Sequence, residues 1–448
     1  MRTTRKSVYA LTAGIAGLAL VATGCSSAEE KPAAPSDKAS ATADGPKEPV
    51  TLTISTFNEF GYENYDEDGN APTNLFDEYT KANPHVTIKH DKIATADEAR
   101  EKLTTGLAAG SGLSDIVAVE IDWLAEFLQY ADKFNDLTDP ALEGRWVQAK
   151  YDGAKTADGK LIGYGTDMGP QGLCYRPDLF KEAGLPTDRT EVAALLEGGW
   201  DKYFAEGEKF VAKSDAAWFD SAGATYQGMI NQVEQSYEAP DGTVLGIEND
   251  VVKKIYDDVL SASVDKDLSA HLGQWSDDWK AGFQKDAFAT MLCPGWMLGV
   301  VEGNSKGKTW DFADVYPGGG GNWGGSYLTV PTQSKNADEA KALAAWLTAP
   351  EQQVKAFEAK GQYPSAIDAQ NDPKVKSATN KFFNDAPYGE ILANRAAAIK
   401  VTPYKGKNYF AVHNVVSNAL TRVDVDKTDD AASSWEKAKT EYAELGLS

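Results

Sequence analysis

Strands and helices alternate along the first folded part of the chain. Residues 50–55 read Val-Thr-Leu-Thr-Ile-Ser, a β-branched run that is typical of a strand. Further elements are expected in turn: a helix from residue 75 up to the Asn83-Pro84 pair, a strand at 86–88, a helix at 98–109 and a strand at 115–119. A helix that connects two neighbouring strands generally makes those strands parallel. The order therefore predicts an α/β fold with a mostly parallel sheet.

The first 25 residues have the parts of a secretory signal. Arg2, Arg5 and Lys6 precede an apolar run over 8–22, and the small residues Thr23 and Gly24 lead to Cys25. A cysteine in this position resembles the lipobox of bacterial lipoproteins, in which the upstream segment is removed and the new N-terminal thiol is diacylated. We expect residues 1–24 to be a signal peptide and Cys25 to carry the lipid. An ordinary cleaved signal with an incidental cysteine is the alternative.

The segment after Cys25 is expected to be a flexible tether, which extends to residue 48. Residues 26–47 are rich in Ser, Ala, Pro, Asp and Lys and contain no large apolar side chain, so they cannot bury enough surface to fold. No later segment approaches the roughly 20 apolar residues that a membrane span needs. The sequence thus predicts a folded protein on the extracytoplasmic face of the membrane, attached through the lipid alone.

Length and charge limit the classes of ligand. The folded part is long enough for two domains at roughly 150 residues each. The formal charge of the chain is -23, and removal of the three basic signal residues makes it more negative still. Nucleic acid is therefore excluded as a partner and anionic ligands are disfavoured, so a neutral polar ligand is expected. The four histidines show no spacing typical of a metal site, and no metal or cofactor is expected.

Two cysteines remain if Cys25 is lipidated. Cys174 and Cys293 each lie in a short apolar run, and we interpret the two runs as buried neighbouring strands. Outside the cytoplasm such a pair tends to oxidise, so a disulfide is a reasonable expectation. Two separate buried thiols are the alternative.

Six segments stand out along the chain after the tether. They read VTLTIS, FDEYTKANPHVTI, KLTTGLAAGSGLSDIVAV, GKLIGYGTDMGPQGLCYRPDLFKEAGLP, FATMLCPGWMLG and EAKALAAWLTAPEQQ. In their order and spacing, these segments resemble the family-1 extracellular solute-binding proteins of ABC sugar importers. Two shorter segments, TMLCPGWM and QWSDDWKAGF, further look like actinobacterial cello-oligosaccharide binders. The resemblance covers essentially the whole chain after the tether.

The resemblance implies a periplasmic-binding-protein-like fold, with two α/β lobes, a hinge and a ligand cleft between the lobes. The ends of strands in an open sheet are also where ligands generally bind. The implied first lobe comprises 49–166 plus 326–384, and the second lobe 167–325 plus 385–448. The implied crossings are Gly-rich or turn-rich and lie near 165–167, 324–326 and 384–389. The implied partners are the permease subunits of an ABC transporter, with the binding protein as a monomer.

Aromatic side chains are the first group of candidate site residues, because a sugar ring presents C–H faces that stack on them. By resemblance, Trp296 and Tyr409 match stacking positions of the family. The glycine before Trp296 indicates an exposed turn. Trp275 and Trp279 lie four residues apart, so one helix would place both on one face, either as a platform or as a packing ridge. Trp123 and Trp323 follow a strand and precede a crossing, respectively, and complete the aromatic set.

Polar side chains that end strands are the second group of candidates. Asn58 and Glu59 end the first strand, Asp122 follows the third, and Asp167 and Gln171 flank the first crossing. Carboxylates form strong hydrogen bonds with neutral hydroxyls, which suits a sugar ligand. Helix capping or a solvated surface is the alternative for each of these residues.

The sequence therefore predicts a non-enzymatic binding protein that captures a neutral oligosaccharide, with cellobiose or cellotriose as the implied ligand. Chito-, malto- or xylo-oligosaccharides are alternative ligands. Two cleft carboxylates could also act as the acid and the nucleophile of an extracellular glycoside hydrolase. However, among 67 Asp and Glu residues no spacing singles out a catalytic pair.

Overall fold

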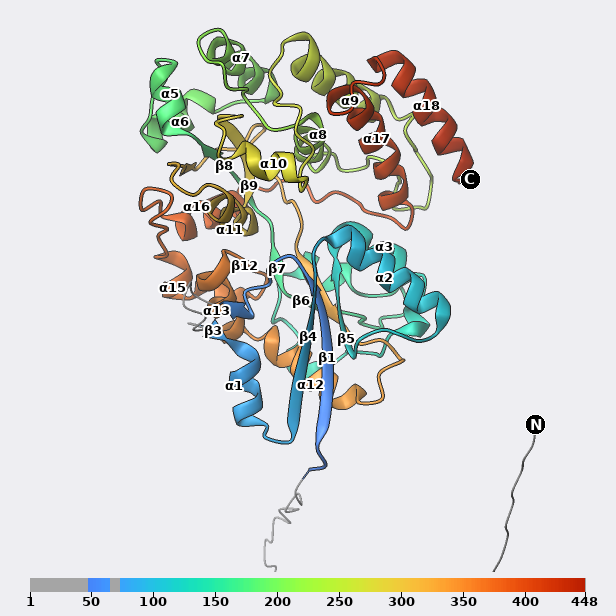
Figure 1. Cartoon of the computed structure of the whole chain (residues 1–448). Helices are drawn as coiled ribbons and strands as arrows, with labels where there is room; N and C mark the ends of the chain where they lie inside the picture. The colour runs from blue at the N-terminus through green and yellow to red at the C-terminus, as the bar shows by residue number, and fades with distance from the viewer. Residues whose placement is uncertain (1–46, 65–72, 448) are drawn as a thin grey trace, which may run out of the picture. The chain divides into compact units, whose positions relative to one another are not determined.

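The computed structural model describes residues 47–64 and 73–447 (Figure 1). The predicted signal peptide, Cys25 and the tether up to residue 46 lie outside the described residues. From Glu48 onward the chain forms one unit with two lobes, each of which is built on its own sheet.

The first lobe is built on a five-stranded sheet with the strand order β4-β1-β5-β11-β6. Its strands are β1 (Val50–Phe57), β4 (Val86–Ile93), β5 (Ile116–Glu120), β6 (Tyr164–Gly165) and β11 (Ser326–Thr329). β1 pairs in parallel with β4 and β5, which confirms the prediction from the alternating elements. β11 comes from much later in the chain and runs antiparallel to both β5 and β6.

Helices and two short strand pairs complete the first lobe (Figure 1). The helices are α1 (Leu75–Ala82), α2 (Ala96–Ala109), α3 (Ile121–Leu128), α4 (Gln148–Gly153), α12 (Ala337–Leu347), α13 (Pro350–Lys360), α14 (Ile367–Asn371) and α15 (Pro373–Lys376). The strand pairs are β2 (Glu63–Asn64) with β3 (Thr73–Asn74), and β7 (Asp167–Met168) with β12 (Tyr363–Pro364).

Local sequence explains how the elements of the first lobe begin and end. Leu52 and Ile54 of β1 are fully buried, and the threonines between and before them are less buried, so the strand shows the alternation of a sheet with one face in the core. Helix α2 begins after Thr95, whose hydroxyl accepts a hydrogen bond from the Glu98 amide at 3.2 Å. It ends at Gly110, which has a φ of 67°. This end is the one that the sequence predicts.

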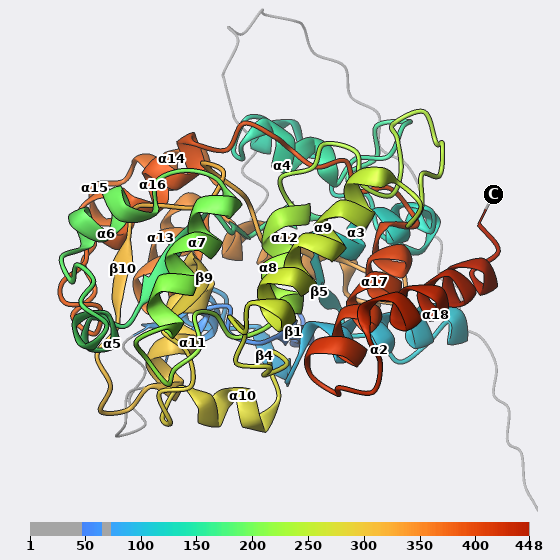
Figure 2. The ribbon, with the colours of Figure 1, turned by 90° about the horizontal axis from the view of Figure 1, so that it is seen from above.

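The second lobe is built on a three-stranded antiparallel sheet, so the parallel pattern does not extend to it. The strands are β8 (Gln171–Tyr175), β9 (Thr290–Pro294) and β10 (Asp311–Ala313), in the order β10-β8-β9. The helices are α5 (Pro177–Glu182), α6 (Arg189–Leu196), α7 (Trp200–Val211), α8 (Ala222–Ile230), α9 (Asp250–Leu260), α10 (Asp277–Gly282), α11 (Gly295–Asn304), α16 (Tyr388–Ala397), α17 (Tyr409–Asp424) and α18 (Ala431–Glu444). Helices α8, α9 and α17 pack against one another, as the view from above shows (Figure 2).

Cys174 and Cys293 lie on the neighbouring strands β8 and β9, and every residue of both strands is buried. Their Sγ atoms are 2.05 Å apart and form a disulfide. The two cysteines are 119 residues apart in the sequence, so the bond joins distant parts of the second lobe.

The chain passes between the two sheets in short segments. It leaves the first sheet after β6, runs through β7 and enters the second sheet at β8, and it returns between β10 and β11. A further passage lies between α15 and α16, where Asn384 and Asp385 have φ angles of 52° and 55°. The predicted crossings near 165–167, 324–326 and 384–389 overlap these passages in part, since Gly165 belongs to β6, Ser326 to β11 and Tyr388 to α16. Within the described residues, no helix combines the length and the apolar character that crossing a bilayer requires.

Candidate ligand-binding site

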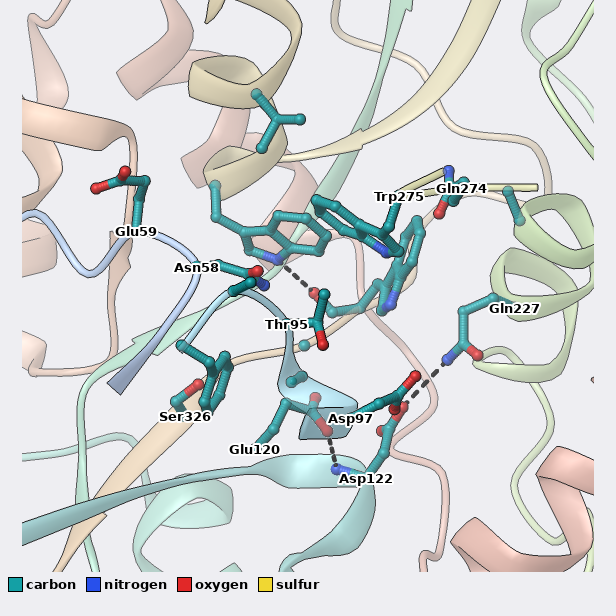
Figure 3. Close-up of a pocket in the computed structure, with 18 of the residues that line it drawn as sticks. Asn58, Glu59, Thr95, Asp97, Glu120, Asp122, Gln227, Gln274, Trp275 and Ser326 are labelled. Atoms are coloured by element: carbon teal, nitrogen blue, oxygen red, sulfur yellow. Dashed lines mark hydrogen bonds between the residues drawn. The ribbon is translucent and has the colours of Figure 1, made fainter. Parts of the chain in front are cut away.

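A large pocket lies between the two lobes, with a volume of about 1110 Å³ (Figure 3). The first lobe contributes the end of β1, the start of α2 and the junction of β5 with α3. The second lobe contributes α8, the loop before α10, the start of α11 and one face of α17. Pockets for small ligands generally measure about 300 to 1,000 Å³, so this one offers room for a ligand of several rings. Nine of the predicted site residues line it: Asn58, Glu59, Asp122, Trp123, Asp167, Trp275, Trp279, Trp296 and Trp323.

Four tryptophans form an aromatic wall on the second-lobe side and at the return passage. The Trp275 and Trp296 rings are nearly parallel, with centroids 6.0 Å apart and an interplanar angle of 23°. Trp279 lies 5.4 Å from Trp275, and Trp323 meets Trp296 edge to face at 5.3 Å. The Trp296 indole N–H donates to the Trp323 carbonyl at 3.0 Å. Trp275, Trp296 and Trp323 are half-buried, whereas Trp279 is fully buried and supports the wall from behind.

The local backbone of this wall differs from the sequence prediction at two places. Trp275 and Trp279 do not share a helix, because α10 begins only at Asp277, after the cap residue Ser276. Trp275 instead has a φ of 73°, and this turn brings its ring next to Trp279. Gly295 is not in an exposed turn: it is the buried first residue of α11, where a Cβ would lie 2.5 Å from the Gly361 carbonyl oxygen. The close approach of these two backbones explains the glycine.

Carboxylates line the first-lobe side of the pocket, at the end of β5. Figure 3 shows Glu120, Asp97 and Asp122 on this side, across from Trp275 and Gln274. The Glu120 carboxylate accepts a hydrogen bond from the Asp122 amide at 2.7 Å and so caps α3. Burial and the neighbouring Asp122 charge raise the pKa of Glu120 well above its usual value.

Asp122 joins the two lobes. Its carboxylate accepts a hydrogen bond from Gln227 Nε2 of α8 at 3.3 Å and forms an ion pair with Lys405, which precedes α17. Both partners belong to the second lobe, whereas Asp122 is on α3 of the first lobe. The ion pair is nearly shielded from solvent, with 9% of the Lys405 side chain and 12% of the Asp122 side chain exposed.

Asp167 lies on the passage between the lobes and is almost fully buried. Its carboxylate accepts hydrogen bonds from the Thr166 hydroxyl at 2.7 Å and from the Ser326 amide at 2.9 Å, so it also fastens the return passage. Burial raises the pKa of Asp167, and the charge of Lys150 opposes this effect. Burial likewise lowers the pKa of Lys150 to about 8.

Asn58 and Glu59 follow β1 and lie at the pocket edge (Figure 3). Asn58 has a φ of 50°, and its backbone N–H donates to the Ile93 carbonyl at 3.1 Å. Glu59 forms an ion pair with Lys92 and is about half exposed. The turn at Asn58 directs both residues away from the sheet and toward the pocket.

Gln171 and Tyr409 are not among the described residues that line the pocket. Gln171 is fully buried in β8, where its amide donates to the Tyr316 hydroxyl at 2.9 Å. Tyr409 begins α17, but its ring is 1% exposed and stacks on His413 at 5.8 Å. The first turn of α17 thus directs this ring into the core of the second lobe. Trp123 lines the pocket but is also 1% exposed, because it packs against other aromatic rings of the first lobe.

Several pocket residues have no clear signal in the sequence. Gln227 lies in the mostly apolar helix α8, and Thr95 and Asp97 lie at the start of α2, where capping alone would explain them. Glu120 directly follows the predicted strand at 115–119, and Gln274 precedes Trp275, so their positions could have suggested them. The remaining additions from α17 are Phe410, His413, Asn414, Ser417, Leu420, Thr421 and Asp424.

Comparisons with known proteins agree with this arrangement. Residues 74–384 match the model of a family described as bacterial extracellular solute-binding protein. The arabinooligosaccharide-binding protein of Bacillus subtilis (strain 168) is 26% identical over 315 residues, which is 66% of this chain and 68% of the relative. A crystal structure described as extracellular solute-binding protein family 1 is 48% identical, with a TM-score of 0.76 over 88% of this chain and 99% of that chain.

A more distant structure shares the fold. The ABC transporter associated binding protein of B. animalis subsp. lactis Bl-04, in complex with β-1,6-galactobiose, is 19% identical, with a TM-score of 0.73 over 89% of this chain and 98% of that chain. The family match covers more than half of this chain, and the fold has the two lobes of such proteins. The chain therefore belongs to the bacterial extracellular solute-binding protein family.

Proposed function

We propose that this protein is the substrate-binding component of an ABC importer and that it captures a neutral oligosaccharide outside the cytoplasm. The observation that carries the proposal is the pocket itself, in which half-buried tryptophans face carboxylates across the gap between the lobes. Aromatic faces suit the C–H faces of sugar rings, and carboxylates suit their hydroxyl groups. The names of two relatives, which refer to arabinooligosaccharide and to β-1,6-galactobiose, support a carbohydrate ligand.

Cellobiose or cellotriose is the proposed ligand within this class. The two segments that look like cello-oligosaccharide binders both contribute to the pocket: residues 274–283 supply Trp275 and Trp279, and residues 290–297 supply Trp296. The volume of about 1110 Å³ leaves room for more than one sugar ring.

Capture would involve closure of the lobes and presentation to a permease. We propose lobes of 49–166 plus 326–384 and of 167–325 plus 385–448, which close about the three passages. The protein would act as a monomer that Cys25 anchors in the outer face of the membrane. The strongly negative chain favours a neutral ligand over an anionic one.

Calorimetry with purified protein tests the ligand class. Cello-oligosaccharides of two to four units are expected to bind saturably and more tightly than chito-, malto-, xylo- or arabino-oligosaccharides of equal length. Tighter binding of another series would contradict the proposed ligand and leave the transport role intact. Binding of none of these sugars would contradict the carbohydrate-binding role.

Incubation with cellobiose and cellotriose separates a binding protein from a hydrolase. The binding protein returns both sugars unchanged, whereas a hydrolase releases glucose. Chromatography of the sugars after prolonged incubation gives the answer, and catalytic release of glucose would contradict the proposal.

A further inference from the structure

Asp220 lies behind the pocket wall and contacts the loop that carries Trp275. It is 2% exposed and does not line the pocket, although the next residue, Ser221, does. One carboxylate oxygen of Asp220 accepts hydrogen bonds from Gln274 Nε2 at 2.8 Å and from the Trp279 indole N–H at 2.9 Å. The other oxygen accepts from the Ser221 amide at 2.9 Å, and the Asp220 carbonyl accepts from the Leu272 amide at 3.1 Å.

The loop that these bonds hold, residues 267–276, is named here the platform loop. Its backbone is strained: Asp267, His271 and Trp275 have φ angles of 53°, 57° and 73°, a region that side-chain-bearing residues seldom adopt. Such residues persist only where the surroundings fix them. Asp424 supplies a second fixed point, since it accepts hydrogen bonds from His271 Nδ1 at 2.7 Å and from the Ala222 amide at 2.8 Å.

The orientation of Trp275 depends on this framework. Trp275 lies between Gln274 and the helix that contains Trp279, and both of these neighbours are bonded to Asp220. The Trp275 ring lies nearly parallel to Trp296 and is one of the three half-buried rings of the aromatic wall. Release of Gln274 and Trp279 would free the platform loop to leave its strained conformation.

We infer that Asp220 is a positioning residue, whose buried carboxylate holds the platform loop so that Trp275 is ready to receive a sugar ring. The identity of the ligand rests on the proposed function, but the organisation of the loop does not. Asp220 itself does not line the pocket, so it acts through Trp275, Trp279 and Gln274.

Both carboxylate oxygens are needed as acceptors. Asparagine at this position keeps one acceptor oxygen and replaces the other by an amide group that only donates. In one orientation of the side chain, that amide group faces the Ser221 N–H group. In the other orientation, it faces the N–H groups of Gln274 and Trp279. At least one hydrogen bond is therefore lost in either orientation. Asp220→Asn therefore weakens the framework, either at Ser221 or at Gln274 and Trp279, while it keeps the size of the side chain.

Protonation of Asp220 has a similar effect. Burial raises the pKa of Asp220 to about 6. The hydrogen bonds from Gln274 and Trp279 favour the charged form and so limit this rise. The titratable groups that face this region are Tyr203 on α7, Asp424 on α17 and His271 in the platform loop. Tyr203 stays neutral in this range, because burial raises its pKa. His271 needs its own control, because it is a titratable side chain within the platform loop itself.

The experiment compares Asp220→Asn with two controls. Asp278→Asn removes an exposed carboxylate from α10, and Val252→Ala weakens the core of the second lobe at α9, away from the pocket lining. The readouts are the near-ultraviolet circular dichroism of the ligand-free protein, which reports on the coupled tryptophans, and the cellotriose Kd from calorimetry. Asp220→Asn is expected to lose much of the tryptophan signal and to weaken binding by roughly tenfold or more. Both controls are expected to keep the wild-type spectrum and Kd.

The inference is overturned if Asp220→Asn folds and has a wild-type spectrum or a wild-type Kd, so that the substitution lowers only the Tm. If Asp220→Asn does not fold, the wild-type protein and His271→Gln are titrated from about pH 8 to about pH 5. The tryptophan signal is then expected to fall with a midpoint near the pKa of Asp220 in both proteins, and a constant signal overturns the inference. If the wild-type protein binds no sugar, the proposed function fails, but the spectra of the ligand-free proteins still decide the role of Asp220.

Discussion

At the scale of single residues, Trp296 is the centre of the aromatic wall. Its ring contacts both Trp275 and Trp323, and its indole N–H is fixed by the Trp323 carbonyl. Its neighbour Gly324, at a φ of 78°, leaves room for this arrangement, since a Cβ there would lie 3.0 Å from the Trp296 indole nitrogen. The ring is thus held in place before a ligand binds, so less side-chain entropy is lost on binding.

Trp296→Ala is expected to weaken binding of the best oligosaccharide by roughly tenfold or more. The expected cost is about 1 to 3 kcal/mol, by analogy with aromatic anchors in other binding sites. Calorimetry gives the Kd, and far-ultraviolet circular dichroism checks the fold. Trp346→Ala is the matched control, because Trp346 packs against Tyr79 in the first lobe and does not line the pocket. Wild-type affinity in folded Trp296→Ala would contradict the aromatic platform.

His413 gives the protein a pH dependence of stability. Burial, reinforced by Lys405 and opposed by Asp122, lowers the pKa of His413 from 6.5 to about 4. Between these two values the unfolded chain binds a proton that the folded chain does not, so the free energy of unfolding falls as the pH falls through this window. The full effect is roughly 3 kcal/mol. Urea unfolding at about pH 7 and about pH 4.5 should show a smaller difference for His413→Gln than for the wild type. Equal differences would contradict this assignment.

At the scale of elements, β8 and β9 position the second-lobe side of the pocket. β9 leads directly into α11, so the pairing of β9 with β8 fixes the place at which Trp296 leaves the strand. The disulfide fastens these two strands to each other. The support of the aromatic wall is therefore both covalent and hydrogen-bonded.

Loss of this disulfide is expected to lower the free energy of unfolding by about 2 to 5 kcal/mol, because the bond closes a long loop in the unfolded chain. Mass spectrometry of peptides from non-reduced protein should show Cys174 linked to Cys293. A thermal melt with and without reductant measures the effect on stability. Two free thiols in oxidised extracellular material would contradict the bond.

The first lobe was more predictable than the second for a physical reason. The strands β1, β4 and β5 are β-branched runs separated by capped helices, and these signals are local. The platform loop has no such signal: the left-handed conformation of His271 and Trp275 depends on bonds to Asp220 and Asp424, which are distant in sequence. The burial of Tyr409 is likewise decided by the packing of α17 and not by its place at a helix start.

At the scale of the whole molecule, the binding pocket exists only because the two lobes face each other. The passages between the sheets bring β5 and α3 opposite α8, α11 and α17, and neither lobe alone encloses the pocket. The sequence predicts this arrangement only through its resemblance to a family, since no spacing of residues reveals which strand ends will meet. The proposal of a neutral ligand rests instead on the charge of the entire chain.

Cys25→Ala tests the proposed lipid anchor. The substitution is expected to release the protein into the medium or to leave it unprocessed at the membrane, because no thiol remains to be diacylated. Fractionation of cells, with the mass of the mature N-terminus, gives the measurement. Ser26→Ala is the control and is expected to stay anchored. A Cys25→Ala protein that is processed and still membrane-bound would contradict the lipid anchor.

The bonds of Asp122 to both Lys405 and Gln227 have a consequence for affinity. A hydroxyl group that approaches Asp122 meets a carboxylate that is already partnered from the opposite lobe. Binding at this end of the pocket then replaces bonds between the two lobes by bonds between Asp122 and the ligand. The measured affinity is a difference between two sets of bonds, so a variant that weakens the attraction between the lobes can strengthen the hold on the sugar.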